Sequence, residues 1–151
     1  MAEAVLKGNS SNAIIISFDS KWMKALEDDL ISVVFRKRGP TKIFVNQIYV
    51  YIKGPVKSII GRLEVIKVKQ LCISECIDLS SKGAIKKKEL VQYATNYEKL
   101  FVFYVKPMKK ANSQISYFQL RERYNFNAPQ NFVILSKEGK EIIEKLGKFK
   151  K

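Results

Sequence analysis

The sequence predicts one α+β domain, a mixed β-barrel of six or seven strands with about three helices. Short apolar runs rich in β-branched and aromatic residues recur along nearly the whole chain, which is typical of buried strands. Three other segments repeat their apolar residues at helical spacing. A length of 151 residues with 46% hydrophobic residues suits a single packed domain.

The first half of the chain should contain four strands and one helix. Asp19 and Ser20 are good N-caps, and Trp22, Leu26 and Leu30 follow at helical spacing. Gly61 interrupts a long alternating run and predicts a bulge or bend there. In order, we expect a strand over 13–18, the helix over about 20–29, and strands over 31–35, 43–52 and 56–68.

The second half is expected to alternate helices and strands, although 71–81 fits neither pattern clearly. Pro107 should end one strand, and Ser136 should cap a terminal helix with Ile142, Ile143 and Leu146 on its apolar face. The expected elements are a helix over 86–96, strands over 99–106, 115–120 and 129–135, and the terminal helix. Residues 1–12 are predicted to form a flexible arm, 13–147 the single domain and 148–151 a basic tail.

Charge is the strongest functional signal in the composition. Lys and Arg total 28 against 14 Asp and Glu, which gives a formal charge of +14 and indicates a polyanionic partner, most often nucleic acid. The alternative is a solvated basic surface.

Several functional classes are excluded or disfavoured by what the chain lacks. With no histidine, the sequence excludes the usual Ser–His–Asp and Cys–His catalytic sites and every His-based zinc site. Cys72 and Cys76 cannot complete a zinc shell and do not form a CxxC pair. We expect no metal, no cofactor and no membrane partner, and no apolar run approaches the roughly 20 residues that cross a bilayer. The expected location is cytoplasmic; the oligomeric state is not indicated.

Three segments, in order, resemble the ASCH family. They are SVVFRKR at 32–38, similar to a strand reading Glu-Phe-Arg-x-Arg; YIKGPVKSIIGRLEV at 51–65, similar to Tyr-x-Ser-Ser-Pro-Val-Lys-x-Ile-x-Gly; and APQNFVILS at 128–136, similar to Pro-Pro-Gln-Ser-Phe-x-Tyr-Leu. Glu89 and Tyr93 stand where the family has its second helix. The resemblance implies a PUA-like barrel with a cleft near the opening helix, related to modules that read RNA or modified bases.

The chain departs from the family where some small members carry an amidohydrolase site for acetylated cytidine. The resemblance places Ile31 at the position of the family lysine, Val34 at that of the threonine and Asp29 at that of a glycine; Glu89 stands near the glutamate. Neither Ile31 nor Val34 can transfer a proton or act as a nucleophile. The sequence therefore leans against an enzyme.

The candidate binding residues are basic, aromatic and amide side chains in four clusters. Guanidinium groups bind phosphate in bidentate fashion, aromatic rings stack on bases, and amides read base edges. The alternatives are a solvated strand end, core packing of the tyrosine, and amides that satisfy strand backbone. The clusters are Arg36, Lys37 and Arg38; Tyr51, Lys53 and Lys57; Arg121 and Arg123; and Gln130 and Asn131.

The favoured hypothesis is a noncatalytic module that holds RNA, single-stranded nucleic acid or a nucleotide in a basic cleft. The alternative is an ASCH-type enzyme, either an amidohydrolase of modified nucleosides or a metal-free ribonuclease. Tyr51, Lys53 and Ser58 would share the acid–base roles in such a ribonuclease.

Overall fold

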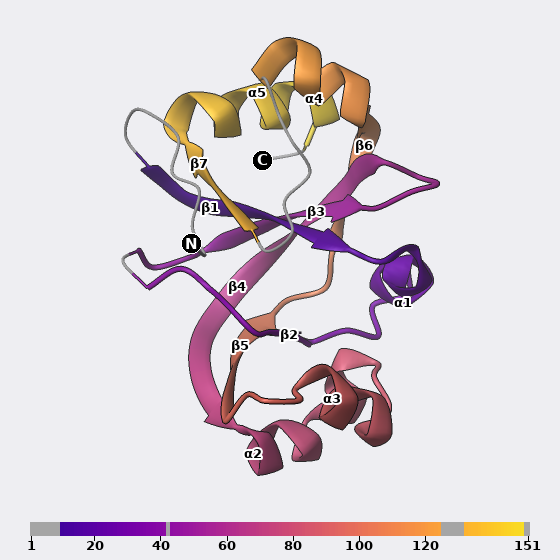
Figure 1. The fold of residues 1–151 in the computed structure, drawn as a ribbon. Helices are drawn as coiled ribbons and strands as arrows, with labels where there is room; N and C mark the ends of the chain where they lie inside the picture. The colour runs from indigo at the N-terminus through magenta and orange to yellow at the C-terminus, as the bar shows by residue number, and fades with distance from the viewer. Residues whose placement is uncertain (1–9, 42, 125–131, 150–151) are drawn as a thin grey trace.

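The structure is a computed structural model that describes residues 10–41, 43–124 and 132–149. In this part of the chain, seven strands form one mixed sheet that curls into an open barrel, with helices around it (Figure 1). The predicted α+β barrel is therefore confirmed. The expectation of about three helices was too low, because the described residues form five α-helices and two short 3-10 helices.

The strands follow one another across the sheet in the order β2-β5-β4-β3-β1-β7, and β6 pairs separately with β4. β1 and β3 are parallel, whereas the other pairs are antiparallel. The strands are β1 (Ser10–Phe18), β2 (Val33–Arg36), β3 (Gln47–Ile52), β4 (Ser58–Cys72), β5 (Lys99–Val105), β6 (Lys109–Ser116) and β7 (Phe132–Ser136).

The helices lie on two sides of the sheet and at one end of β1 (Figure 1). None of them, within the described residues, has the length and apolar character to cross a membrane. They are η1 (Ser20–Trp22), α1 (Met23–Glu27), α2 (Ile73–Asp78), η2 (Ser80–Gly83), α3 (Lys87–Tyr93), α4 (Tyr117–Tyr124) and α5 (Lys137–Gly147).

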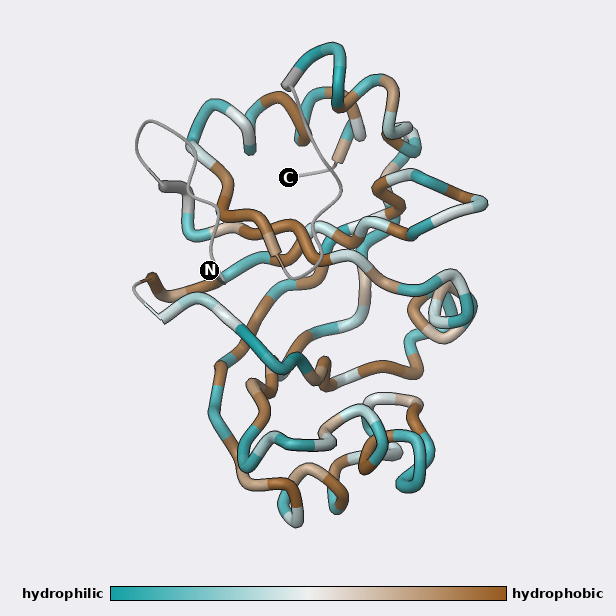
Figure 2. Tube along the Cα trace, viewed as in Figure 1, coloured by the Kyte–Doolittle hydropathy of each residue, from teal (hydrophilic) through white to brown (hydrophobic). Residues whose placement is uncertain are grey.

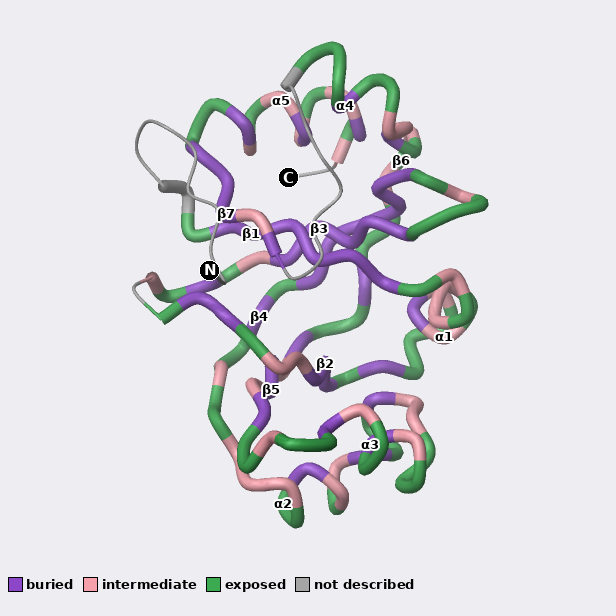
Figure 3. The backbone as a smooth tube through the Cα atoms, in the orientation of Figure 1, coloured by how far each residue is buried: buried purple, intermediate pink, exposed green. Residues whose placement is uncertain are grey.

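The core consists of three clusters, one inside the barrel and two beneath the helices. The period of two in β3 separates the first two clusters: Ile48, Val50 and Ile52 face the barrel interior, while Tyr49 and Tyr51 pack beneath α4 and α5. The third cluster packs α2 and α3 against β2 and β5. Apolar and buried residues accordingly follow β1 and β3 through the middle of the molecule (Figures 2 and 3).

A bulge next to Gly61 lets β4 pair with both β3 and β6. The register of both ladders shifts between Ile59 and Gly61. A Cβ atom at position 61 would lie 2.6 Å from the carbonyl oxygen of Lys109, so only glycine permits this approach of β6. The predicted bend at Gly61 is confirmed.

The strand predicted over 115–120 is wrong after Ser116, where α4 begins. Ser116 and Gln119 form a capping box, in which the Ser116 hydroxyl accepts from the Gln119 N–H and the Gln119 side chain accepts from the Ser116 N–H. The prediction that Leu30 continues the apolar face of the first helix is also wrong, because Leu30 lies beyond the end of α1 and is 60% exposed.

Asp29 supports the family alignment through its backbone. The alignment places a family glycine there, and Asp29 has a φ of 58°, in the left-handed region that glycine adopts readily. Aspartate is one of the few other residues that tolerate this region.

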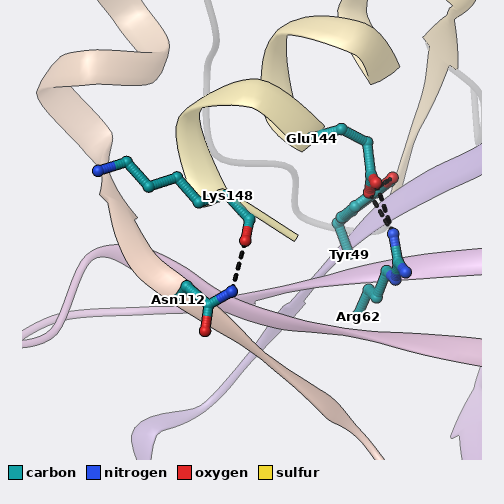
Figure 4. Close-up of polar contacts among 5 residues, drawn as sticks. All are labelled: Tyr49, Arg62, Asn112, Glu144 and Lys148. Atoms are coloured by element: carbon teal, nitrogen blue, oxygen red, sulfur yellow. Dashed lines mark hydrogen bonds and ion pairs between the residues drawn. The ribbon is translucent and has the colours of Figure 1, made fainter. Parts of the chain in front are cut away.

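A partly buried polar cluster of Tyr49, Arg62 and Glu144 connects α5 to the sheet (Figure 4). The Tyr49 hydroxyl donates to Glu144 at 2.5 Å, and Arg62 pairs with the same carboxylate at 2.6 Å. Near the end of α5, the Asn112 side chain donates to the Lys148 carbonyl oxygen at 2.6 Å. The Ser136 hydroxyl accepts from the Gly139 N–H, which confirms the predicted cap.

Candidate functional site

A cleft of about 410 Å³ lies between the end of β1, the helical turn that follows it, β2 and α3. This is close to the opening helix, where the family resemblance placed a cleft. Its volume is in the range of pockets that bind small molecules. Apolar lining comes from Trp22, Ile31 and Val34, and charged lining comes from Asp19, Lys21, Arg36, Lys37, Lys53 and Glu89.

Arg36 ends β2 and lines this cleft. Its guanidinium donates to the carbonyl oxygens of Phe35 at 2.6 Å and Ser17 at 3.1 Å, and lies 4.6 Å from the ring centroid of Phe18. Burial lowers the pKa of the Arg36 guanidinium from its ordinary value, although arginine remains protonated in proteins. No carboxylate forms an ion pair with Arg36 in the described part of the chain. Among the described residues, its positive charge is therefore met by neutral groups, the two carbonyl oxygens and the Phe18 ring.

Lys37 connects the end of β2 to α3. Its backbone N–H donates to the Tyr93 hydroxyl at 3.2 Å, and its ammonium lies 4.7 Å and 5.5 Å from the ring centroids of Tyr93 and Tyr97. Cation–π contacts of this kind orient an ammonium without neutralising its charge. Lys37 therefore also contributes positive charge at the cleft.

Lys53 brings a third cation to the cleft from a distant segment. Its backbone N–H donates to the Phe18 carbonyl oxygen at 2.9 Å, which holds the β3–β4 turn beside the end of β1. The Lys53 side chain is exposed and makes no ion pair with any described residue. Arg36, Lys37 and Lys53, three of the predicted binding residues, thus lie around one cavity.

Lys21 and Trp22 belong to the cleft although sequence reasoning did not select either. Lys21 forms an ion pair with Glu89 of α3 and lies 4.9 Å from the ring centroid of Trp22. Glu89, the partner of Lys21, had a sequence signal in its place in the family pattern. Trp22 had a weaker one, because it is the only tryptophan in the chain and follows a helix cap.

The two positions at which the chain departs from the amidohydrolase pattern both line the cleft. Ile31 is 6% exposed and Val34 is 3% exposed. The cleft wall is therefore apolar at the two positions where the resemblance places a lysine and a threonine.

The other predicted residues do not join the cleft. Arg38 and Lys57 are exposed but do not line it, and Tyr51 is 2% exposed in the cluster beneath α4 and α5. Burial raises the pKa of Tyr51. Tyr51 is therefore core, the alternative that the sequence left open, and its ring has no exposed face for stacking.

Arg121 and Arg123 lie on α4, on the side of the sheet opposite α3 (Figure 1). The Arg121 guanidinium donates to the Tyr117 hydroxyl at 3.3 Å. Gln130 and Asn131 lie outside the described residues, as do residues 1–9 of the predicted arm and the last two residues of the predicted tail.

The two cysteines are free thiols. Cys72 caps α2 and its thiol lies 3.0 Å from the Glu75 carboxylate, whereas burial raises the pKa of Cys76. The described residues contain no group of three or more metal-ligating acidic or cysteine side chains.

Comparisons with known proteins agree with this architecture. No protein-family model and no curated protein sequence matches the chain. Among solved structures, the chain is similar to an ASCH protein from Zymomonas mobilis, with a TM-score of 0.82 and 26% identity over 89% of this chain and 95% of that one. The structure of a variant of that protein has a TM-score of 0.82 and 25% identity, and the match covers 91% of this chain and 98% of the variant's chain.

A more distant likeness concerns the fold alone. The N-terminal domain of McrB from Staphylothermus marinus has a TM-score of 0.60 and 13% identity, covering 94% of this chain and 99% of that domain.

The strong likeness to the Zymomonas structures extends over about nine-tenths of the chain, well beyond the motifs that first indicated the family. The chain therefore has the fold of the ASCH domain.

Proposed function

We propose that the protein is a noncatalytic RNA-binding module that receives one nucleotide of a single strand in the cleft beside α1. The observation that supports this most is the convergence of Arg36, Lys37 and Lys53 around a cavity that also exposes Trp22. These residues come from two separate segments, so only the fold brings them together.

The cleft lining contains separate surfaces for the base and for the phosphate of a nucleotide. Ile31, Val34 and Trp22 offer apolar and aromatic surface for a base. Recognition of single-stranded RNA commonly combines such stacking with hydrogen bonds to base edges. Lys53 is exposed, so its ammonium can approach a phosphate that stays in contact with water.

The net charge of +14 supports the same partner. Each phosphate that lysine or arginine neutralises releases counterions, so affinity falls as salt rises. The exposed Arg38, Lys57, Arg121 and Arg123 would extend the attraction over the rest of the surface without entering the cleft.

Fluorescence anisotropy of a labelled single-stranded RNA tests the proposal. The wild type should bind, and affinity should fall steeply between low and high salt. The Lys37→Ala/Lys53→Ala variant should bind several-fold more weakly and with a shallower salt dependence. Binding that does not depend on salt would contradict the electrostatic part of the proposal.

The matched control is Lys137→Ala/Lys145→Ala. It removes the same charge from exposed positions on α5, across the sheet from α3 (Figure 1). If this control weakens binding as much as the cleft variant does, the RNA responds to total charge and the cleft is not the site.

A second candidate is an enzyme of modified nucleosides, favoured by the Lys21–Glu89 pair in the cleft. The pair offers a carboxylate and an ammonium, groups that can act in acid–base chemistry, although Lys21 comes from a different element than the family pattern requires. Incubation with acetylated cytidine and with labelled RNA tests this candidate. Turnover by the wild type that is lost in Glu89→Gln would replace the noncatalytic proposal.

A further inference from the structure

We infer that Arg36 reads the inserted base, and that the cleft selects nucleobases with two adjacent hydrogen-bond acceptors on one edge, namely cytosine and guanine, over uracil and adenine. The inference rests on the proposed function, because it needs a nucleotide in the cleft. It also revises the role that the sequence suggested for Arg36, which was to clamp phosphate.

The first step is that the Arg36 guanidinium is held in a fixed orientation. Two carbonyl oxygens, from Phe35 at 2.6 Å and Ser17 at 3.1 Å, accept from its two terminal nitrogens, and the Phe18 ring lies 4.6 Å from its central carbon. A group held in this way loses little freedom when a ligand binds. It is therefore suited to discriminate between ligand edges.

The second step is that donors remain for a ligand. A guanidinium has more N–H groups than these two hydrogen bonds use, and it cannot accept a hydrogen bond. The described residues supply Arg36 with no further hydrogen bond and no ion pair. The remaining N–H groups are therefore available, as far as the described residues go, to acceptors that enter the cleft.

The third step concerns where the base and the phosphate can lie. Val34 and Arg36 project to the same face of β2, and the buried Ile31 and Val34 line the same cavity. This apolar surface suits a flat base and disfavours a phosphate, which loses more hydration on burial. Lys53 is the exposed cation of the cleft and suits the phosphate better.

The fourth step is the chemistry of the base edges. Cytosine offers its O2 and N3 atoms as neighbouring acceptors, and guanine offers O6 and N7, the pair that arginine binds in bidentate fashion. Uracil has an N3–H donor beside each carbonyl oxygen, and adenine has an amino group beside N7 and beside N1. A bidentate approach to either of these two bases would bring one of its N–H donors against an N–H of the guanidinium, which cannot accept a hydrogen bond.

Isothermal titration with CMP, GMP, UMP and AMP tests the inference. In the wild type, CMP and GMP should each bind at least about fivefold more tightly than UMP and AMP, as expected for one bidentate contact. Arg36→Lys keeps the charge but removes the planar fork, so it should lose this preference. The matched control Arg38→Lys, at an exposed position outside the cleft, should keep it.

A second measurement avoids any change to the protein. The 3-deaza analogue of CMP and the 7-deaza analogue of GMP each lack one acceptor of the pair, and the preferred nucleotide should lose at least about fivefold in affinity on this replacement. Equal binding of all four nucleotides, an Arg36→Lys variant that keeps the preference, or deaza analogues that bind as well as their parents would overturn the inference alone. Binding of none of the four would overturn the proposed function as well.

Discussion

Arg62 is buried and Arg36 is partly buried, and the partners of the two guanidinium groups differ. Arg62 lies beneath α5, where Glu144 neutralises it and the Tyr49 hydroxyl shares the same carboxylate (Figure 4). Arg36 lies at the end of β2, where it donates only to backbone carbonyl oxygens beside a cavity. The comparison separates an arginine whose charge is neutralised inside the fold from one whose charge stays unpaired among the described residues, beside a cavity.

The pKa shifts of the two arginines have opposite directions, which agrees with this difference in partners. Burial lowers the pKa of Arg62, but the hydrogen bond and the charge of Glu144 outweigh it, so the net shift is upward. Burial also lowers the pKa of Arg36, and no carboxylate reverses this. The fold therefore tolerates an electrostatic cost at Arg36 that it offsets at Arg62, as is common at functional sites.

The largest expected effect on stability is that of Glu144→Gln. It leaves the Arg62 guanidinium, whose side chain is 11% exposed, without its counter-charge. Breaking such a buried pair should lower the free energy of unfolding by about 3 kcal/mol. Urea denaturation measures this, and RNA affinity of the folded variant should not change. A loss below about 1 kcal/mol would mean that the pair behaves as a surface contact.

Tyr49→Phe should have the next largest effect, a loss of about 2 kcal/mol from one hydrogen bond to a carboxylate. Burial raises the pKa of Tyr49, and so do the hydrogen bond and charge of Glu144. The folded protein therefore keeps this proton at a pH where the unfolded chain releases it.

The Tyr49 contribution is fully present below the unfolded tyrosine pKa of about 10 and is lost as pH rises above that value. Between about pH 9 and pH 11, the wild type should lose more stability than Tyr49→Phe does. Equal losses, measured by urea unfolding at both pH values, would contradict this account of the polar cluster.

Compared with Glu144→Gln, Arg36→Met should lower stability less and RNA affinity more. It removes two hydrogen bonds to carbonyl oxygens and no ion pair, so the loss of stability should be about 1–2 kcal/mol, smaller than for Glu144→Gln. RNA affinity, measured by anisotropy, should fall several-fold. An Arg36→Met variant that is far less stable than Glu144→Gln, with unchanged binding, would reverse the roles of the two arginines.

Glu64→Gln should have the smallest effect and serves as the control for Glu144→Gln. Glu64 pairs with Lys106 at 3.0 Å, but both side chains are more than half exposed. An exposed pair of this kind should contribute little to the free energy of unfolding, and less still at high salt, because water and ions screen both charges. A loss as large as that of Glu144→Gln would show that burial does not set the difference between the two pairs.

Local patterns in the sequence predicted most of the elements, and the errors arose where local signals conflict. Ile115, Tyr117 and Leu120 favour a strand, yet the Ser116–Gln119 capping box was a readable signal for α4 that the apolar residues obscured. The ambiguous stretch over 71–81 contains α2, capped by Cys72, which is not among the preferred capping residues.

The candidate site was less predictable because its contacts join distant positions. Lys21 and Glu89 are 68 residues apart, so no local pattern relates them. Arg36 was selected as part of a basic cluster and for its family position, but the orientation of its guanidinium depends on the carbonyl oxygen of Ser17, which only the fold brings near. Sequence identified the cations; the structure shows which of them face a cavity.

The most direct test of the central claim uses Trp22, the only tryptophan of the chain, which lines the cleft. Titration of the wild type with single-stranded RNA should change tryptophan fluorescence until saturation, with the same midpoint as the anisotropy of the labelled RNA. Binding seen by anisotropy with no change at Trp22 would place the RNA elsewhere on the basic surface and contradict the account.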